Sequence, residues 1–124
     1  MSVLITGASR GIGRSIALNL ADDHDIAVNY RNSSDAANEV VNVIQKDGGN
    51  AIAVQGDVRD PADVDSMITE IIDEFGELDG VVNNAGIVEP DLATEINDDQ
   101  WNRVLDTNLT GAFYVTRAAI PYLE

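Results

Sequence analysis

The 124 residues contain no cysteine, one lysine and one histidine, and this scarcity excludes several kinds of site. Without cysteine there are neither disulfides nor thiolate metal sites, and the sequence predicts no metal centre. No stretch approaches the roughly 18 apolar residues that a membrane-spanning helix needs. The first residues lack a basic region followed by an apolar block, so we expect no signal peptide and a cytoplasmic protein.

Positive charge is scarce as well. The sequence has 7 Lys and Arg against 22 Asp and Glu, a formal net charge of −15. Such a chain repels nucleic acids and anionic lipids, so neither a nucleic acid nor a membrane is expected as a partner. This composition indicates a halophilic protein, whose charged surface repels itself less because high salt screens the repulsion. The alternative is an acidic protein from an organism that lives at ordinary salt concentrations. The acids are spread along the chain, for example at Asp22, Asp23, Asp25, Asp60, Asp63, Asp65, Asp98 and Asp99.

Short apolar runs alternate with helical patterns along the chain. Strands are predicted over residues 3–5, 26–28, 51–54 and 78–82. Apolar residues between the strands recur at helical spacing, in stripes at positions 12, 16 and 20, then 37 to 44, then 64 to 75, and last 101 to 116, ending near Pro121. Helix boundaries are predicted from a cap at Ser34, a stop at Gly48, a cap at Asp60 and a stop at Gly76.

This order of elements predicts the fold. Strands that alternate with helices imply a parallel sheet covered on both faces. Right-handed crossovers then favour the strand order 3-2-1-4. We therefore predict one α/β domain over residues 1–124, a Rossmann-type doubly wound parallel sheet of four β-α units that ends after the fourth helix.

Three glycines occupy the first predicted turn from strand to helix. Gly7 permits the tight turn, Gly11 lets the backbone approach a pyrophosphate, and Gly13 allows the helix to pack closely on the strand. The N-terminus of the adjoining helix would direct its N–H groups toward the phosphates. A plain Gly-rich turn is the alternative, but the position between a strand and a helix favours a dinucleotide site.

The spacing of these glycines resembles the short-chain dehydrogenase/reductase family. The pattern is Thr6-Gly7-x-x-x-Gly11-x-Gly13, and three further family motifs come after it in order: Asp57-Val58, Asn83-Asn84-Ala85-Gly86 and Asn108-Leu109-Thr110-Gly111. The segments TGASRGIG and VNYR most resemble 3-oxoacyl-(acyl-carrier-protein) reductases. The resemblance implies an oxidoreductase that binds a nicotinamide dinucleotide. It implies cofactor-binding residues at Gly7, Ser9, Arg10, Gly11, Ile12, Gly13, Tyr30, Arg31, Asp57, Val58, Asn84, Ala85 and Gly86.

The end of the second predicted strand bears on which dinucleotide is bound. A carboxylate there would bind the adenosine ribose and repel a 2′-phosphate, but this sequence has Tyr30 followed by Arg31. Arg10, in the glycine loop, is a second candidate partner for the phosphate. We therefore expect NADP(H) to be preferred over NAD(H); two solvated arginines without a ligand are the alternative.

The remaining motifs have roles implied by the resemblance, each beside a structural alternative. Asp57 would accept a hydrogen bond from the adenine amino group while Val58 contacts the ring, or Asp57 caps the turn before Asp60. The backbone of Asn83-Asn84-Ala85-Gly86 would line the nicotinamide ribose; the alternative is that one Asn only ties neighbouring strands together. The candidate catalytic residue is Asn108, which helical spacing turns inward on an apolar stripe. In the family this Asn holds a water in a proton relay; its alternative role is to steady the helix.

The family's reaction also requires a Tyr, a Lys four residues later, and a Ser. No tyrosine here is followed by a lysine at that spacing, and the only lysine, Lys46, lies in the second predicted helix. We therefore expect the cofactor-binding half of a reductase, without its catalytic half, which would meet a carbonyl substrate only in a complete protein. A binding module without chemistry, or a chain that works only by assembling with another, are the alternatives. An uncovered fourth strand and last helix predict self-association.

Overall fold

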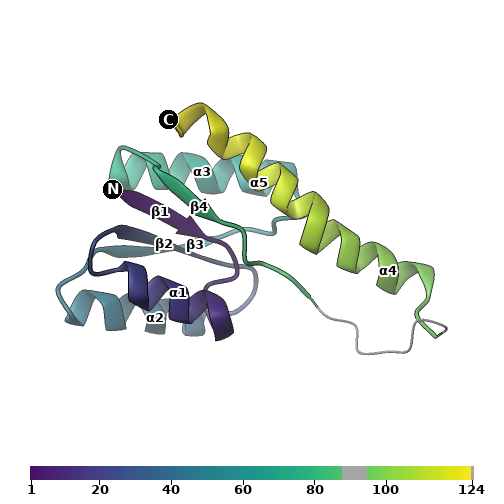
Figure 1. The fold of residues 1–124 in the computed structure, drawn as a ribbon, viewed down its shortest axis with the longest axis horizontal. Helices are drawn as coiled ribbons and strands as arrows, with labels where there is room; N and C mark the ends of the chain where they lie inside the picture. Colours follow the sequence, from purple (N-terminus) through teal and green to yellow (C-terminus); the bar gives the residue numbers. More distant parts are fainter. Residues whose placement is uncertain (88–94, 124) are drawn as a thin grey trace.

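A four-stranded parallel sheet forms the centre of the computed structural model, which describes residues 1–87 and 95–123 (Figure 1). The order of the strands is β3-β2-β1-β4, and each neighbouring pair is parallel, so the predicted α/β fold and strand order are confirmed. The strands are β1 (Ser2–Ile5), β2 (Asp25–Tyr30), β3 (Ala51–Gln55) and β4 (Gly80–Val82).

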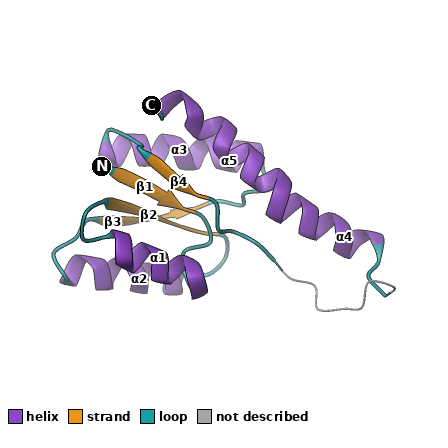
Figure 2. Cartoon of the chain, viewed as in Figure 1, coloured by secondary structure: helices purple, strands orange, loops and turns teal. Residues whose placement is uncertain are grey.

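Helices cover both faces of the sheet (Figure 2). On one face lie α1 (Gly11–Leu20) and α2 (Ser34–Lys46), and on the other lie α3 (Pro61–Phe75) and α5 (Gly111–Ala119). Neighbouring strand residues point to opposite faces, so Ile5 belongs to the core beneath α1 and α2, and Leu4 to the core beneath α3 and α5. No helix in the described part of the chain is both long enough and apolar enough to span a membrane.

The helix boundaries agree with the predicted signals with one exception. The Asp60 carboxylate accepts a hydrogen bond from the Ala62 N–H at 2.9 Å, and Gly76 ends α3 in the left-handed region at φ 78°. The prediction that Ser34 caps α2 is wrong by one residue. The cap position is Ser33, and its hydroxyl does not bond the helix but accepts from Arg10.

The fourth strand is shorter than the predicted range 78–82. Among the described residues it pairs with β1 alone, and the register begins at Val3 opposite Gly80. The preceding Asp79 uses its side chain to accept from the Ser2 N–H at 2.8 Å, while its own N–H donates to the Ser2 carbonyl. Leu78 therefore lies before the strand, although it is almost fully buried.

The predicted last helix has an interruption in its middle. It divides into α4 (Asp98–Leu105), a π-helical turn (Asp106–Thr110) and α5, and α4 extends beyond the sheet (Figure 1). A π turn inserts an extra residue and rotates the next helical segment around the helix axis. The stripe that faces the core is therefore Thr107, Gly111, Val115 and Ala119 rather than the predicted stripe through position 108.

The apolar stripe predicted for the first helix is only partly confirmed: Ile16 and Leu20 pack against the core, but Ile12 does not. Gly13 and Ala17 are its buried residues, whereas Ile12 is 75% exposed. A Cβ on Gly13 would lie 2.5 Å from the Gly7 carbonyl oxygen, so only the smallest residue permits this approach. Close packing through small residues rotates the larger Ile12 out to solvent, and its predicted place in the buried stripe is wrong.

Candidate functional site

A cavity of about 360 Å³ opens at the carboxyl ends of the strands. This is the edge at which open parallel sheets bind ligands. The cavity receives residues from the loops after all four strands and from the π turn. Its lining consists of Gly7, Ser9, Arg10, Asn29, Tyr30, Arg31, Asn32, Ser33, Gly56, Asp57, Val58, Ala85, Gly86, Ile87 and Thr107.

The glycine loop forms one wall of the cavity and leads into α1. Gly7 and Gly11 both have φ of 61°, in the left-handed region that glycine enters without strain. The N-cap of α1 is Arg10, which offers no side-chain acceptor to the helix, and the first turn holds no acid. The first N–H groups of α1 and the positive end of its dipole therefore suit an anion such as a phosphate.

The loop is held in place by the ends of neighbouring strands. The Thr6 hydroxyl accepts from the N–H groups of Asn84 and Ala85 at 3.0 and 2.9 Å. The Asn84 amide donates to the carbonyls of Thr6 and Gly7 at 3.2 and 3.1 Å. Asn84 thus has the tying role that the sequence left open, because it joins the end of β1 to the loop after β4.

Asn29 braces the same loop from the other side. Its side-chain oxygen accepts from the Gly7 N–H at 3.1 Å, and its amide donates to the carbonyls of Val54 and Gly56 at 3.3 and 3.2 Å. Asn29 is only 2% exposed, so these bonds satisfy a polar group that burial would otherwise penalise. One buried amide therefore links the ends of three strands around the cavity.

Two arginines lie at the end of the cavity formed by the loop after β2. Arg10 donates from its guanidinium to the Ser33 hydroxyl. Arg31 has a half-exposed side chain, and its Nε lies 3.5 Å from a carboxylate oxygen of Asp57. Tyr30 ends β2 in the position where a ribose-binding carboxylate would stand. This end of the cavity therefore carries two guanidinium groups, with the Asp57 carboxylate beside one of them.

Asp57 is engaged by a third arginine. Arg59 donates from Nε to Oδ1 at 3.0 Å and from Nη2 to Oδ2 at 2.7 Å, and its backbone N–H donates to Oδ1 at 3.0 Å. The Arg59 side chain is the main reason why the pKa of Asp57 lies below its ordinary value; burial opposes this, and the Arg59 N–H and the charges of Arg59 and Arg31 reinforce it. Asp57 thus shapes its own turn, which is the structural alternative to a role at the adenine.

Asn108 lies beside the loop after β4. Its amide donates to the Ile87 carbonyl at 3.1 Å, and its oxygen accepts from the Ile87 N–H at 2.8 Å. The residue is exposed, so its predicted inward orientation on an apolar stripe is wrong. The π turn explains the difference, because its extra residue places Thr107 rather than Asn108 against the core. A Cβ on Gly86 would approach the Asn108 oxygen to 3.1 Å.

The structure gathers most of the predicted cofactor residues around this one cavity. Gly11, Ile12, Gly13 and Asn84 stand apart from the lining, and Gly13 and Asn84 act by shaping the loop. Sequence reasoning missed several lining residues: Asn29, Asn32, Ser33, Gly56, Ile87 and Thr107. Asn29 carried a signal, since a polar residue at the end of an apolar strand requires partners.

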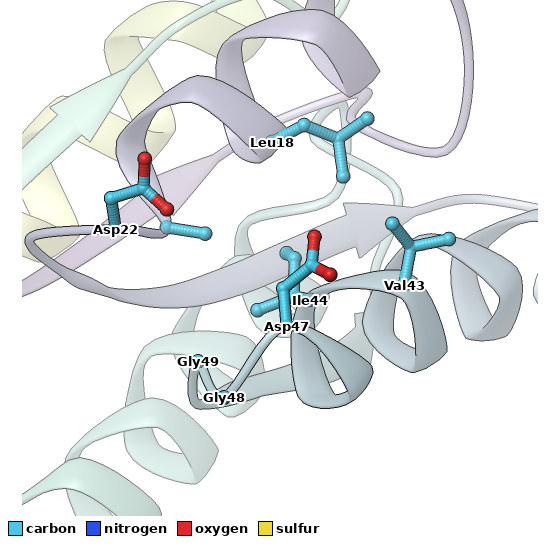
Figure 3. Close-up of a pocket in the computed structure, with 8 residues that line it drawn as sticks. Leu18, Asp22, Val43, Ile44, Asp47, Gly48 and Gly49 are labelled. Carbon is cyan, nitrogen blue, oxygen red and sulfur yellow. The ribbon is translucent and has the colours of Figure 1, made fainter.

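A second, smaller cavity of about 190 Å³ lies where α1 and α2 end, at the opposite edge of the sheet (Figure 3). The carboxylates of Asp22 and Asp47 come to it from the two helix ends (Figure 3). Helix C-termini carry partial negative charge, which adds to these carboxylates and disfavours a phosphate. The nucleotide candidate is therefore the cavity beside the glycine loop.

Comparison with known proteins shows which family the chain resembles. The model of the family described as short chain dehydrogenase matches residues 1–124. The chain belongs to this family. It is 46% identical over 123 residues to the 3-oxoacyl-(acyl-carrier-protein) reductase FabG of Staphylococcus aureus, and 44% identical to that of Staphylococcus epidermidis. Each match covers 98% of this chain and 50% of the relative, so the chain spans about half the length of these relatives.

Solved structures agree with this assignment. A dehydrogenase/reductase from Sinorhizobium meliloti superposes with a TM-score of 0.95 at 34% identity, over 98% of this chain and 49% of that one. A mutant of a short-chain dehydrogenase/reductase from Serratia marcescens superposes with a TM-score of 0.93 at 30% identity. The match covers 99% of this chain and 51% of that one. The parallel sheet is thus that of a short-chain dehydrogenase.

Proposed function

We propose that the chain is the NADP(H)-binding part of a short-chain reductase that transfers hydride between the cofactor and a carbonyl or alcohol substrate of the 3-oxoacyl type. The glycine loop and the start of α1 would hold the pyrophosphate, and the loop after β4 would face the nicotinamide ribose. The cofactor, when bound, supplies the hydride. Asn108 would position a water for proton transfer, and its exposed amide beside Ile87 is compatible with that role.

The observation that carries the preference for NADP(H) is the charge around the end of β2. Arg10 and Arg31 line the cavity, and Tyr30 takes the place of a carboxylate that would repel a 2′-phosphate. Positive side chains are scarce in this chain, with 7 Lys and Arg against 22 Asp and Glu, so the occurrence of two arginines in one cavity supports a specific anion. A guanidinium binds a phosphate through paired N–H groups.

A binding module without chemistry is the second candidate, favoured by one observation. None of the tyrosines in the 124 residues has a lysine four positions later. Without that general acid the alkoxide formed by hydride transfer is not protonated. We expect the chain to bind NADPH but to oxidise it with a 3-oxoacyl thioester only at the background rate, followed by absorbance of the reduced nicotinamide. Turnover that survives repurification and disappears in Gly13→Ala would contradict this.

We further propose that the acidic surface is an adaptation to a salt-rich cytoplasm. The net charge of −15 generates self-repulsion, and the Debye length falls from ~30 Å at 0.01 M salt to ~3 Å at 1 M. The melting temperature should therefore rise steeply between low salt and molar KCl. Thermal denaturation followed by circular dichroism measures it, and a melting temperature independent of KCl would favour an ordinary acidic protein.

We also propose that copies of this chain associate with one another. Trp101, Leu109 and Phe113, on the helical segment after β4, are each more than half exposed, and β4 is an edge strand of the described sheet. Apolar side chains gathered on one segment and an unpaired strand edge both favour association. Because the net charge opposes contact, association should strengthen with salt, and sedimentation in molar KCl tests it.

A further inference from the structure

A carboxylate stands among the arginines that are proposed to bind the 2′-phosphate. Asp57 lines the same cavity as Arg10 and Arg31, and one of its oxygens lies 3.5 Å from Arg31 Nε. An ionised carboxylate in this place would repel a phosphate and would compete with it for Arg31. A preference for NADP(H) therefore needs some group that offsets the charge of Asp57.

Arg59 has the geometry for this task. Its Nε and Nη2 each donate to a different oxygen of Asp57, at 3.0 and 2.7 Å, in the two-point arrangement that suits guanidinium and carboxylate. Arg59 lies closer to Asp57 than Arg31 does. The side chains of Arg59 and Asp57 are only 27% and 23% exposed. Arg59 is not among the residues that line the cavity, whereas Asp57 is.

The competition between the two arginines decides what remains for a ligand. With Arg59 in place, Asp57 Oδ2 accepts from Arg59 Nη2 at 2.7 Å, and Arg31 Nε keeps only a longer ion pair of 3.5 Å to that same oxygen, with half of the Arg31 side chain exposed to solvent. Without Arg59, Arg31 would be the remaining cation beside Asp57 among the described contacts, and the two charges would cancel. Arg10 bonds Ser33 rather than Asp57, so it does not replace Arg59.

We propose that Arg59 is a specificity-determining residue that acts through Asp57: by holding this carboxylate, it leaves Arg31 available to a 2′-phosphate. The proposal rests on the proposed function, since it explains a preference for NADP(H). Arg59 is a positioning residue, because it does not touch the ligand itself. Replacing Arg59 should therefore weaken the binding of the 2′-phosphate and leave the binding of the rest of the nucleotide unchanged.

Adenosine 2′,5′-bisphosphate and 5′-AMP test this, because they differ only in the 2′-phosphate. Calorimetric titration of the purified chain at one fixed salt concentration gives the ratio of their dissociation constants. We expect the bisphosphate to bind more tightly, and its advantage to fall about ten-fold in Arg59→Gln. Arg117→Gln, which removes one positive charge from α5, is the matched control and should leave the ratio unchanged.

The double variant Asp57→Asn with Arg59→Gln should recover the ratio, because a neutral side chain at 57 no longer competes for Arg31. Asp57→Asn alone should leave the ratio close to that of the unmodified chain, because Arg59 already offsets the charge of Asp57. A rise as large as the loss expected in Arg59→Gln would contradict the proposal, so this variant tests it even if Arg59→Gln does not fold. An equal loss for both ligands in Arg59→Gln, or no recovery in the double variant, would overturn the inference alone. Equal affinities in the unmodified chain would overturn the preference for NADP(H) and this inference together.

Discussion

Replacing Gly13 with alanine should abolish dinucleotide binding and destabilise the fold. The added Cβ would lie 2.5 Å from the Gly7 carbonyl oxygen and would also overlap the Asn84 amide nitrogen. The backbone at Gly7 cannot yield without disturbing the loop, and the Asn84 amide is engaged with the carbonyls of Thr6 and Gly7. We expect a loss of about 3 kcal/mol in the free energy of unfolding, from overpacking, together with loss of measurable NADPH binding.

Gly80→Ala is the matched control for this experiment. The chemical change is identical, but the new Cβ would lie 3.6 Å from a Val3 methyl carbon, which is an ordinary contact. Its free energy of unfolding should change by less than about 1 kcal/mol, since Gly-to-Ala changes without strain are mild. Urea denaturation and NADPH titration compare the two variants. Equal stability and equal affinity in Gly13→Ala and Gly80→Ala would show that the close approach at Gly13 does not matter.

The strand order and the glycine loop were predictable because they rest on local patterns. The alternation of apolar runs and helical stripes led to the order β3-β2-β1-β4, and Gly7 and Gly11 do occupy the left-handed region. Asp60 and Gly76 bound α3 as capping chemistry requires. The glycines and caps each act within one turn, and the strand order follows from the general right-handedness of crossovers, so the sequence carries this information directly.

The features that escaped prediction depend on contacts between distant residues or on an irregular backbone. Asn29 finds its partners at Gly7 and Gly56, far away in the chain, so its side chain alone does not reveal the brace. The π turn breaks the 3.6-residue period, and counting through it put Asn108 on the wrong face. The two-point pairing of Arg59 with Asp57 requires a turn whose geometry the spacing does not give.

Replacing Arg31 with aspartate should reverse the cofactor preference. In the unmodified chain Arg31 lines the cavity and forms an ion pair with Asp57 at 3.5 Å. The change removes this cation and places a second carboxylate near Asp57. A carboxylate there repels a 2′-phosphate and can accept hydrogen bonds from a free ribose hydroxyl. We expect the ratio of NADPH to NADH affinity to fall about 100-fold, because the charge at this position changes by two.

Arg31→Lys is the control for Arg31→Asp, because it keeps the charge while losing the forked geometry. It should retain the preference for NADPH with a weaker affinity. Fluorescence titration of the reduced cofactors gives both constants for each variant. If Arg31→Asp weakens NADPH and NADH to the same extent, the side chain shapes the site without reading the 2′-phosphate.

The most direct test of the proposed NADP(H) site is titration of the unmodified chain with NADPH and with NADH, at one salt concentration, followed by fluorescence of the reduced nicotinamide. The cavity beside the glycine loop, with Arg10 and Arg31 at one end and Tyr30 in place of a carboxylate, predicts saturable binding of both. NADPH should bind about ten-fold more tightly, as expected for one phosphate held by arginine. Equal affinities, or no saturable binding of either cofactor by the folded chain, would contradict it.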